Sequence, residues 1–209
     1  MSKVIYRDLL KEDYNSIKSL ICEAFGFKPF TNDENLLDSV LNIYLQNCII
    51  SSSYCKIAEI NNEVVGIILG KAKEDKNKLW SIKNLISILK SFIKLISINS
   101  KNKKIIKELS NITSIYKDLI RNKENQFQGC IQLFIVSEKY RGLKIGKTLL
   151  SYLFSYMKSY KVNSLYLFTD TRCNYGFYDS QGFERIGEKK LLINSNKEIL
   201  NVFLYKYIF

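Results

Sequence analysis

The sequence predicts a single α/β domain in which a central sheet is covered by helices. Short alternating apolar runs, typical of strands, are interleaved with longer segments whose apolar residues recur every three or four positions. The 209 residues, 46% of them hydrophobic, are enough for one sizeable core. One proline and nine glycines leave no stretch with the composition of a flexible linker, so we assign residues 1–209 to one domain.

The first part of the chain predicts, in order, a strand, two helices and two further strands, over residues 3–9, 11–26, 34–47, 54–60 and 63–73. Asn32 or Asp33 is expected to cap the second helix. The last two strands flank a tight turn at Asn61-Asn62, which predicts an antiparallel hairpin.

Residues 74–125 follow a different pattern. Apolar residues at helical spacing from Leu79 to Ile96, and again from Ile105 to Ile120, predict two amphipathic helices. The polar stretch between them leads us to interpret the pair as a helical hairpin inserted between the third and fourth strands. Residues 71–123 hold fourteen Lys or Arg and four Asp or Glu, a balance of +10 out of a net charge of +12.

This excess charge leaves several interpretations open. It can reflect nothing more than a Lys-, Asn- and Ile-rich composition. The helices can also form a lid over a substrate opening, a homodimer interface, or a surface for an anionic membrane or nucleic acid. Lysines among apolar rows usually face solvent, and no RNA-binding motif is visible, so the sequence favours a lid or dimer over a polyanion partner.

The last part of the chain predicts a strand, a helix, a strand, a helix and two closing strands, over residues 130–136, 145–160, 164–170, 173–181, 183–192 and 198–209. The loop before the first of these helices places Gly142 and Gly146 among Arg141, Lys144 and Lys147. Backbone N–H groups at such a helix start, together with the helix dipole, favour a phosphate. The loop matches neither the Walker sequence nor GxGxxG, which excludes those two classes of nucleotide site.

Composition excludes other chemistries. The chain has no histidine, so Ser-His-Asp and Cys-His pairs and imidazole-bound metals are excluded, and we expect no metal site. Five cysteines without a CxxC pair are expected to be free thiols. The N-terminus lacks the pattern of a signal peptide, and the longest apolar stretch is interrupted by Lys83, Lys90 and Lys94, so we expect a soluble cytoplasmic protein.

Two motifs resemble those of the GNAT family, the acyl-CoA-dependent N-acetyltransferases. Residues Arg141 to Gly146 are similar to the family signature Q/R-x-x-G-x-G/A, with Lys144 where the family usually has its first glycine. Downstream, Tyr178, Gly182 and Phe183 resemble the family's YxxxGF helix end. The resemblance implies a mixed, mostly antiparallel sheet of six to seven strands flanked by helices.

The resemblance also implies an acetyl-CoA site. The fourth and fifth strands of the family splay apart, and the pantetheine arm pairs with the fourth, here at Phe134, Ile135 and Val136. The diphosphate would lie on the N–H groups of Arg141, Gly142, Leu143, Lys144, Ile145, Gly146, Lys147 and Thr148. In the family a tyrosine at the position of Tyr178 often supplies the proton that the leaving thiolate needs.

The general base is less clear. The fourth strand carries no carboxylate, and Gln132 can orient a water but cannot accept a proton. Asp170, at the end of the fifth strand, is the nearest candidate, although it can equally cap the helix that follows. Glu59 is a weaker candidate. Cys173 is expected beside the thioester, where a reactive role is one interpretation, but we favour a small buried thiol.

The sequence thus predicts an N-acetyltransferase that moves an acetyl group from acetyl-CoA to a primary amine of a small molecule, peptide or protein. Two alternatives remain: a non-catalytic CoA-binding module on the same fold, and a basic helical protein that binds a membrane or nucleic acid.

Overall fold

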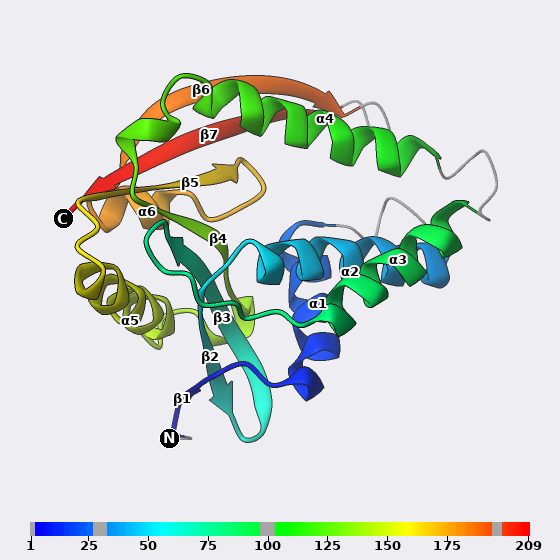
Figure 1. Cartoon of the computed structure of the whole chain (residues 1–209), viewed down its shortest axis with the longest axis horizontal. Helices are drawn as coiled ribbons and strands as arrows, with labels where there is room; N and C mark the ends of the chain where they lie inside the picture. The colour runs from blue at the N-terminus through cyan, green and yellow to red at the C-terminus, as the bar shows by residue number, and fades with distance from the viewer. Residues whose placement is uncertain (1–2, 27–32, 97–102, 194–197) are drawn as a thin grey trace.

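The computed structural model describes residues 3–26, 33–96, 103–193 and 198–209. The strands are β1 (Ile5–Arg7), β2 (Tyr54–Ile60), β3 (Glu63–Ala72), β4 (Gly129–Val136), β5 (Ser164–Asp170), β6 (Glu184–Ile193) and β7 (Glu198–Ile208). The α-helices are α1 (Tyr14–Ala24), α2 (Glu34–Ile50), α3 (Ile82–Ile96), α4 (Lys103–Ile120), α5 (Ile145–Ser159) and α6 (Gly176–Ser180) (Figure 1).

The seven strands form one sheet in the order β1-β2-β3-β4-β5-β7-β6. All neighbouring strands are antiparallel except β4 and β5, which are parallel. The predicted fold class, a mixed and mostly antiparallel sheet flanked by helices, is confirmed. From β1 to β5 the strands lie side by side in the order in which they occur in the sequence. Helix α5 connects β4 to β5 as a crossover, which is why these two strands are parallel.

Two local predictions are also confirmed. Asn61 and Asn62 adopt φ angles of +50° and +64°, which is the left-handed geometry that a two-residue hairpin between β2 and β3 requires. Asp33 caps α2, because its Oδ1 accepts hydrogen bonds from the amides of Asn35 and Leu36 at 3.0 and 3.1 Å. The alternative cap, Asn32, lies outside the described residues.

Helices cover both faces of the sheet. On one face α5 buries Leu149, Leu153 and Met157 against β2 and β3, and Gly70 allows its close approach, since a Cβ there would lie 2.6 Å from Leu153 Cδ1. On the other face α1 and α2 cover the β2–β4 half, with Ile17 fully buried. The β6–β7 half of that face is covered by α4, through the cluster Leu119, Ile120, Phe127, Val202 and Leu204.

The interpretation of residues 74–125 as a helical hairpin is wrong in its packing. Both predicted helices are present, but α3 contacts α2, whereas α4 contacts β6 and β7 (Figure 1). The reason is chemical. Polar side chains of α3, including Asn84, bond to α2, while α4 presents apolar side chains such as Leu119 to the sheet. None of the described helices is long and apolar enough to cross a bilayer.

Candidate active site

Strands β4 and β5 separate after two residue pairs. Gly129 pairs with Leu165 and Cys130 with Tyr166, and in the described chain no later pairing joins the two strands. The cause lies in β4 itself, because the register with β3 jumps from Leu133 to Ile131 and leaves Gln132 as a β-bulge. A bulge bends its strand, so the edge of β4 beyond it faces an opening instead of β5.

The open edge of β4 presents backbone hydrogen-bonding groups. The amide of Ser137 donates to the carbonyl of Val65 at 2.9 Å, on the β3 side. Because successive peptide groups of a strand point to opposite sides, the amides of Phe134 and Val136 point toward the opening. An extended ligand can pair with this edge as an added strand. This geometry fits the pantetheine position expected at residues 134–136.

The loop before α5 leaves a row of amides without backbone partners. The amide of Arg141 donates to the carbonyl of Glu138, and the amide of Thr148 to that of Lys144, at 3.2 and 3.0 Å. Between these two, none of the amides of residues 142–147 donates to a described backbone carbonyl. The expected anion-binding row is therefore narrower than the sequence suggested: the Arg141 and Thr148 amides are already used within the protein.

Left-handed backbone turns the loop into the helix. Gly142 has φ +87° and Lys144, the N-cap of α5, has φ +61°. Lys144 thus adopts the conformation that glycine prefers, at the position where the family signature usually has a glycine. Gly146 has an ordinary φ, and a Cβ there would lie 3.4 Å from the ring of Phe177, an ordinary contact. The protein itself therefore does not require glycine at position 146.

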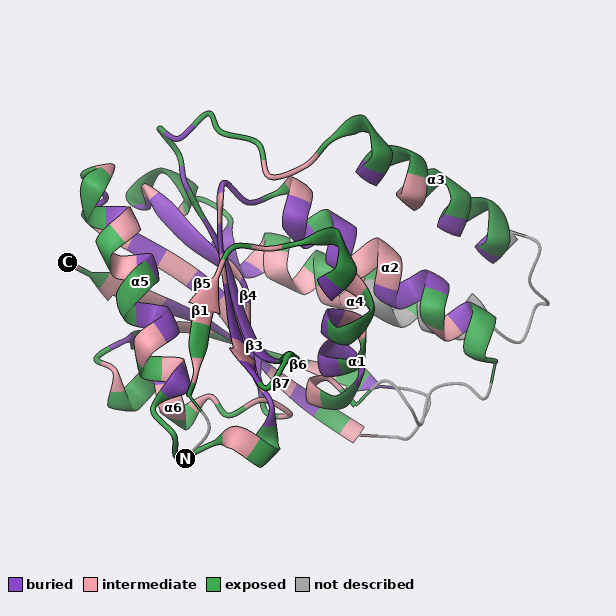
Figure 2. Ribbon diagram, turned by 90° about the horizontal axis from the view of Figure 1, so that it is seen from below, coloured by how far each residue is buried: buried purple, intermediate pink, exposed green. Residues whose placement is uncertain are grey.

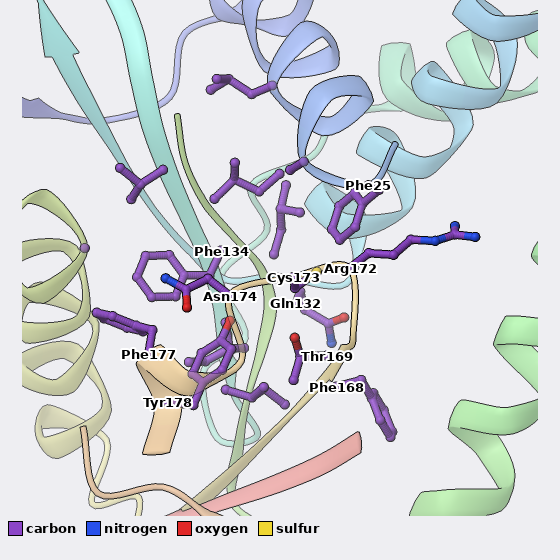
Figure 3. A pocket seen from close by; sticks show the side chains of 18 of the residues that line it. Phe25, Gln132, Phe134, Phe168, Thr169, Arg172, Cys173, Asn174, Phe177 and Tyr178 are labelled. Carbon is purple, nitrogen blue, oxygen red and sulfur yellow. The ribbon is translucent and has the colours of Figure 1, made fainter. Parts of the chain in front are cut away.

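A cavity of about 930 Å³ connects these features. It extends from the loop before α5, along the open edge of β4, to side chains of α1, α2, α4 and β5. All the sequence-predicted cofactor residues except Leu143 and Thr148 line it, as do Asp170 and Tyr178. Figure 3 shows Tyr178, Phe177 and Asn174 grouped near Phe134, with Thr169 and Phe168 farther along β5.

Tyr178 is held by aromatic neighbours, and burial raises the pKa of its hydroxyl. Its ring lies 6.3 Å from that of Phe134, 5.5 Å from that of Phe183 and 5.8 Å from that of Tyr205, measured between centroids. Burial, reinforced by the nearby Cys173 and Asp170, raises the pKa of the Tyr178 hydroxyl well above its usual range. A phenol with such a pKa is a hydrogen-bond donor at neutral pH.

Asp170 combines a structural contact with a place on the cavity wall. Its carboxylate accepts a hydrogen bond from the amide of Arg172 at 2.8 Å, within the turn that follows β5. The capping interpretation is wrong, because α6 begins only at Gly176 and its N-cap is Tyr175. Asp170 is only 7% exposed, and burial raises the pKa of the carboxyl above its ordinary value despite the hydrogen bond from Arg172. A buried carboxylate with a raised pKa is a stronger base than an exposed one.

The other candidate residues differ in position. Glu59 binds Arg7 at 2.6 Å and is not among the residues that line the cavity, so the structure removes it as a base. Gln132 lines the cavity and donates to Cys130 Sγ. Cys173 also lines it and, unlike the other four cysteines, is only partly buried, so the expectation of a buried thiol is wrong. Desolvation still raises the pKa of its thiol to about 12, as expected for an unreactive thiol. No three acidic or Cys side chains of the described residues are grouped to hold a metal ion.

An aromatic group at the far end of the cavity was not predicted. Tyr116 of α4 stacks on Phe168 of β5 with ring centroids 4.4 Å apart. Across the cavity, Tyr44 of α2 meets Phe25, which follows α1, at 5.6 Å. The only sequence signal was an aromatic residue at helical spacing in each helix, which also describes ordinary core residues.

Comparison with known proteins agrees with this geometry. Residues 113–183 match the model of the Acetyltransferase (GNAT) family. The matched segment runs from within α4 to Phe183 and so includes the β4 bulge, the loop before α5, β5 and α6. No curated protein matches the chain in a sequence search. The family resemblance drawn from the sequence is confirmed.

Several solved structures share the fold. The chain is similar to ribosomal-protein-alanine N-acetyltransferase from Brucella melitensis, at 17% identity and a TM-score of 0.56, over 98% of this chain and 99% of that one. It is also similar to NAA60 from Arabidopsis thaliana in complex with a bisubstrate analogue, at 14% identity and a TM-score of 0.54. That match covers 99% of this chain and 98% of the other. A third similar structure is a chain of the NatC complex bound to Gag peptide and CoA. It has 17% sequence identity and a TM-score of 0.50, and the match covers 99% of this chain and 99% of that one. At these identities the likeness shows the fold alone.

Proposed function

We propose that this chain, a member of the GNAT acetyltransferase family by the match over residues 113–183 and by its fold, transfers an acetyl group from acetyl-CoA to a primary amine. One observation carries the proposal: a single cavity brings together the open β4 edge, the unpaired amides before α5, and Tyr178. The acceptor belongs to a small molecule, a peptide or a protein.

The donor would be held mainly by backbone groups. The amides of residues 142–147 and the α5 dipole would bind the diphosphate, and the exposed Arg141, Lys144 and Lys147 would add positive charge. The pantetheine arm would pair with the β4 edge at Phe134 and Val136. Together these contacts would bring the thioester to the part of the cavity that Tyr178 lines.

The chemistry would be direct attack. The nitrogen lone pair of a neutral amine forms a C–N bond with the thioester carbonyl, and the carbonyl becomes a tetrahedral oxyanion, which a β4 amide near Val136 would stabilise. Collapse breaks the C–S bond and releases the thiolate, to which Tyr178 donates a hydrogen bond. Asp170, directly or through a water, would accept the proton lost by the amine.

The cytoplasm is the compartment we propose, because all five cysteines are free, as expected where thiols are kept reduced.

The amine acceptor would enter the cavity from the side formed by α1, α2 and α4, where α4 would act as a lid through Tyr116.

Transfer is tested with acetyl-CoA and a panel of small amines and peptides, with acetylated products detected by mass spectrometry. We expect an acetylated product that depends on the intact chain and is greatly reduced in Tyr178→Phe. CoA binding with no transfer to any amine would instead favour the non-catalytic CoA-binding module.

A further inference from the structure

Helix α3 turns apolar side chains toward solvent. Five of them, which we call the outer face of α3, are exposed to between 43% and 69%: Ile82, Leu85, Ile86, Leu89 and Phe92. They recur every three or four residues and so form one stripe along the helix. Figure 2 shows exposed positions along the side of α3 that faces away from α2. An apolar stripe of this length, left open, marks an interaction surface.

The opposite side of α3 carries polar side chains beside the buried Leu95, and their hydrogen bonds to α2 hold the helix in this orientation. Asn84 Nδ2 donates to Gln46 Oε1 at 2.7 Å, and Asn42 Nδ2 donates to Ser87 Oγ and Ser91 Oγ at 3.0 and 2.9 Å. Asn84 and Ser91 are buried. Rotating the outer face toward α2 would leave these buried polar groups unsatisfied, which is costly. The exposure of the apolar stripe is therefore a consequence of how α3 is attached.

A row of lysines borders the outer face. Lys83, Lys90 and Lys94 are exposed and lie seven and four residues apart, on the helix side next to Ile86. No Asp or Glu occurs anywhere from residue 76 to residue 107. The surface therefore combines an apolar stripe with a cationic border and has no acidic group to pair with that border.

We propose that the outer face of α3 docks the protein on an anionic lipid surface. Headgroups would bind the lysine row while the apolar stripe enters the boundary between headgroups and acyl chains, as in other basic amphipathic helices that lie in the membrane plane. A second copy fits less well, because pairing two outer faces would bring together lysine rows that lack acidic partners. Nucleic acid would complement the lysines but would leave the apolar stripe uncovered. The sequence pattern favoured a lid or dimer over an anionic surface, and for α3 this proposal departs from that preference because its apolar stripe is exposed beside a row of exposed lysines.

The test is co-sedimentation of the full chain with vesicles of phosphatidylcholine alone or of equal parts phosphatidylcholine and phosphatidylserine. We expect binding to the mixed vesicles, weaker binding at high salt, and little binding to phosphatidylcholine alone. Each lysine near an anionic surface contributes about a fivefold factor, so Lys83→Gln, Lys90→Gln and Lys94→Gln combined should weaken binding roughly 100-fold. Leu89→Gln with Phe92→Gln should also weaken it strongly.

Matched variants distinguish binding by this surface from a general effect of net charge or of exposed apolar side chains. Lys11, Lys158 and Lys190 are exposed lysines elsewhere, and changing all three to Gln should leave vesicle binding nearly unchanged. The exposed pair Leu192 and Ile199 of the β6–β7 ribbon provides the apolar control. Circular dichroism melts show whether each variant is folded.

Equal losses in the α3 and control lysine variants would overturn the proposal, as would a wild-type chain that does not bind mixed vesicles. A dimer in light scattering that Leu89→Gln dissociates, without vesicle binding, would assign the face to a second copy. These readouts do not involve acetyl transfer, so their outcome is independent of the proposed function.

Discussion

The two ends of the cavity are built in different ways. The proposed donor end consists of Phe134–Val136, residues 141–147 and Tyr178, and most of it is one strand-loop-helix segment that would bind through backbone groups. The proposed acceptor end consists of Phe25, Tyr44, Tyr116 and Phe168, side chains that come from the residue after α1, from α2, from α4 and from β5. A site made from local backbone geometry can be predicted from a motif, whereas a site made from distant side chains cannot.

This difference predicts a separation of effects. Changes at the donor end should alter CoA affinity or the chemical step, and changes at the acceptor end should alter acceptor selection while leaving CoA affinity intact. Five variants, from the largest expected effect to the smallest, test whether the two ends act separately.

Gly146→Glu should have the largest effect. It places a carboxylate among amides that would bind the diphosphate, and such a like-charge contact costs several kcal/mol, so CoA affinity should fall by more than about 100-fold. Isothermal calorimetry with CoA measures this directly. Gly146→Ala is the matched control, because the protein accommodates a Cβ at 3.4 Å from Phe177. Any smaller loss of CoA affinity in Gly146→Ala would show how closely the ligand approaches the backbone at this position. Unchanged CoA affinity in Gly146→Glu would show that this loop is not part of the site.

Tyr178→Phe should lower kcat on the order of 100-fold, the usual cost of losing one hydrogen-bond donor to a developing negative charge. CoA affinity should change little, because the ring keeps its aromatic contacts. Steady-state kinetics together with calorimetry separate the two quantities. A variant with wild-type kcat would show that the leaving thiolate does not need the hydrogen bond from Tyr178.

Asp170→Asn should change activity and stability in opposite directions. The folded-state pKa of Asp170 is raised, so its contribution to stability is fully present below the unfolded-state pKa and is lost as pH rises through the folded-state value. At neutral pH the folded wild type must bury an ionised carboxylate, which lowers its stability, whereas the Asn variant buries a neutral amide. The variant should therefore have the higher Tm at neutral pH, and the difference should vanish in acid. Activity should fall because the proposed base is lost. Thermal melts across pH and the pH profile of kcat/KM test both, and full activity would leave Asp170 with only its structural contact to the Arg172 amide.

Tyr116→Ala should raise the acceptor KM by about tenfold or less, because it removes the stacking partner of Phe168 at the acceptor end. Tyr116→Phe preserves the stack and should behave like the wild type if stacking is what matters. The CoA affinity should be unchanged in both variants. A loss of CoA affinity in Tyr116→Ala would break the proposed separation between the two ends.

Lys144→Gly should have the smallest effect. It relieves a side chain held at φ +61° and is expected to add about 0.5–1 kcal/mol to the free energy of unfolding. Lys144→Gln removes the same charge but keeps the strained backbone, so comparing CoA affinity and stability in the two variants distinguishes charge from conformation. Urea unfolding measures the stability term.

Sequence reasoning predicted the sheet, the hairpin at Asn61-Asn62 and the loop before α5, because each depends on local periodicity or on the needs of a turn. It could not predict how α3 and α4 would separate. Both have an amphipathic pattern, but only tertiary structure shows that Asn84 and Ser91 are the buried side of α3. In α4 the apolar side is the buried one, with Leu119 against β6 and β7.

Glu59 shows the same limit within the candidate site. As a carboxylate on a central strand it was a reasonable base, yet it pairs with Arg7 of β1, and the pairing of those two strands is a nonlocal contact. Tyr178 and Asp170, by contrast, do line the cavity as the sequence led us to expect, because each lies next to a motif or a strand end that fixes its place.

The central claim is that backbone amides of residues 142–147 bind the diphosphate of CoA and bring its thioester to Tyr178. The most direct measurement is a crystal structure of the chain with acetyl-CoA or CoA bound. We predict electron density for the diphosphate at the start of α5 and for pantetheine along Phe134 and Val136, with the sulfur near the Tyr178 hydroxyl. Clear density for the ligand at any other place in the molecule would contradict the account.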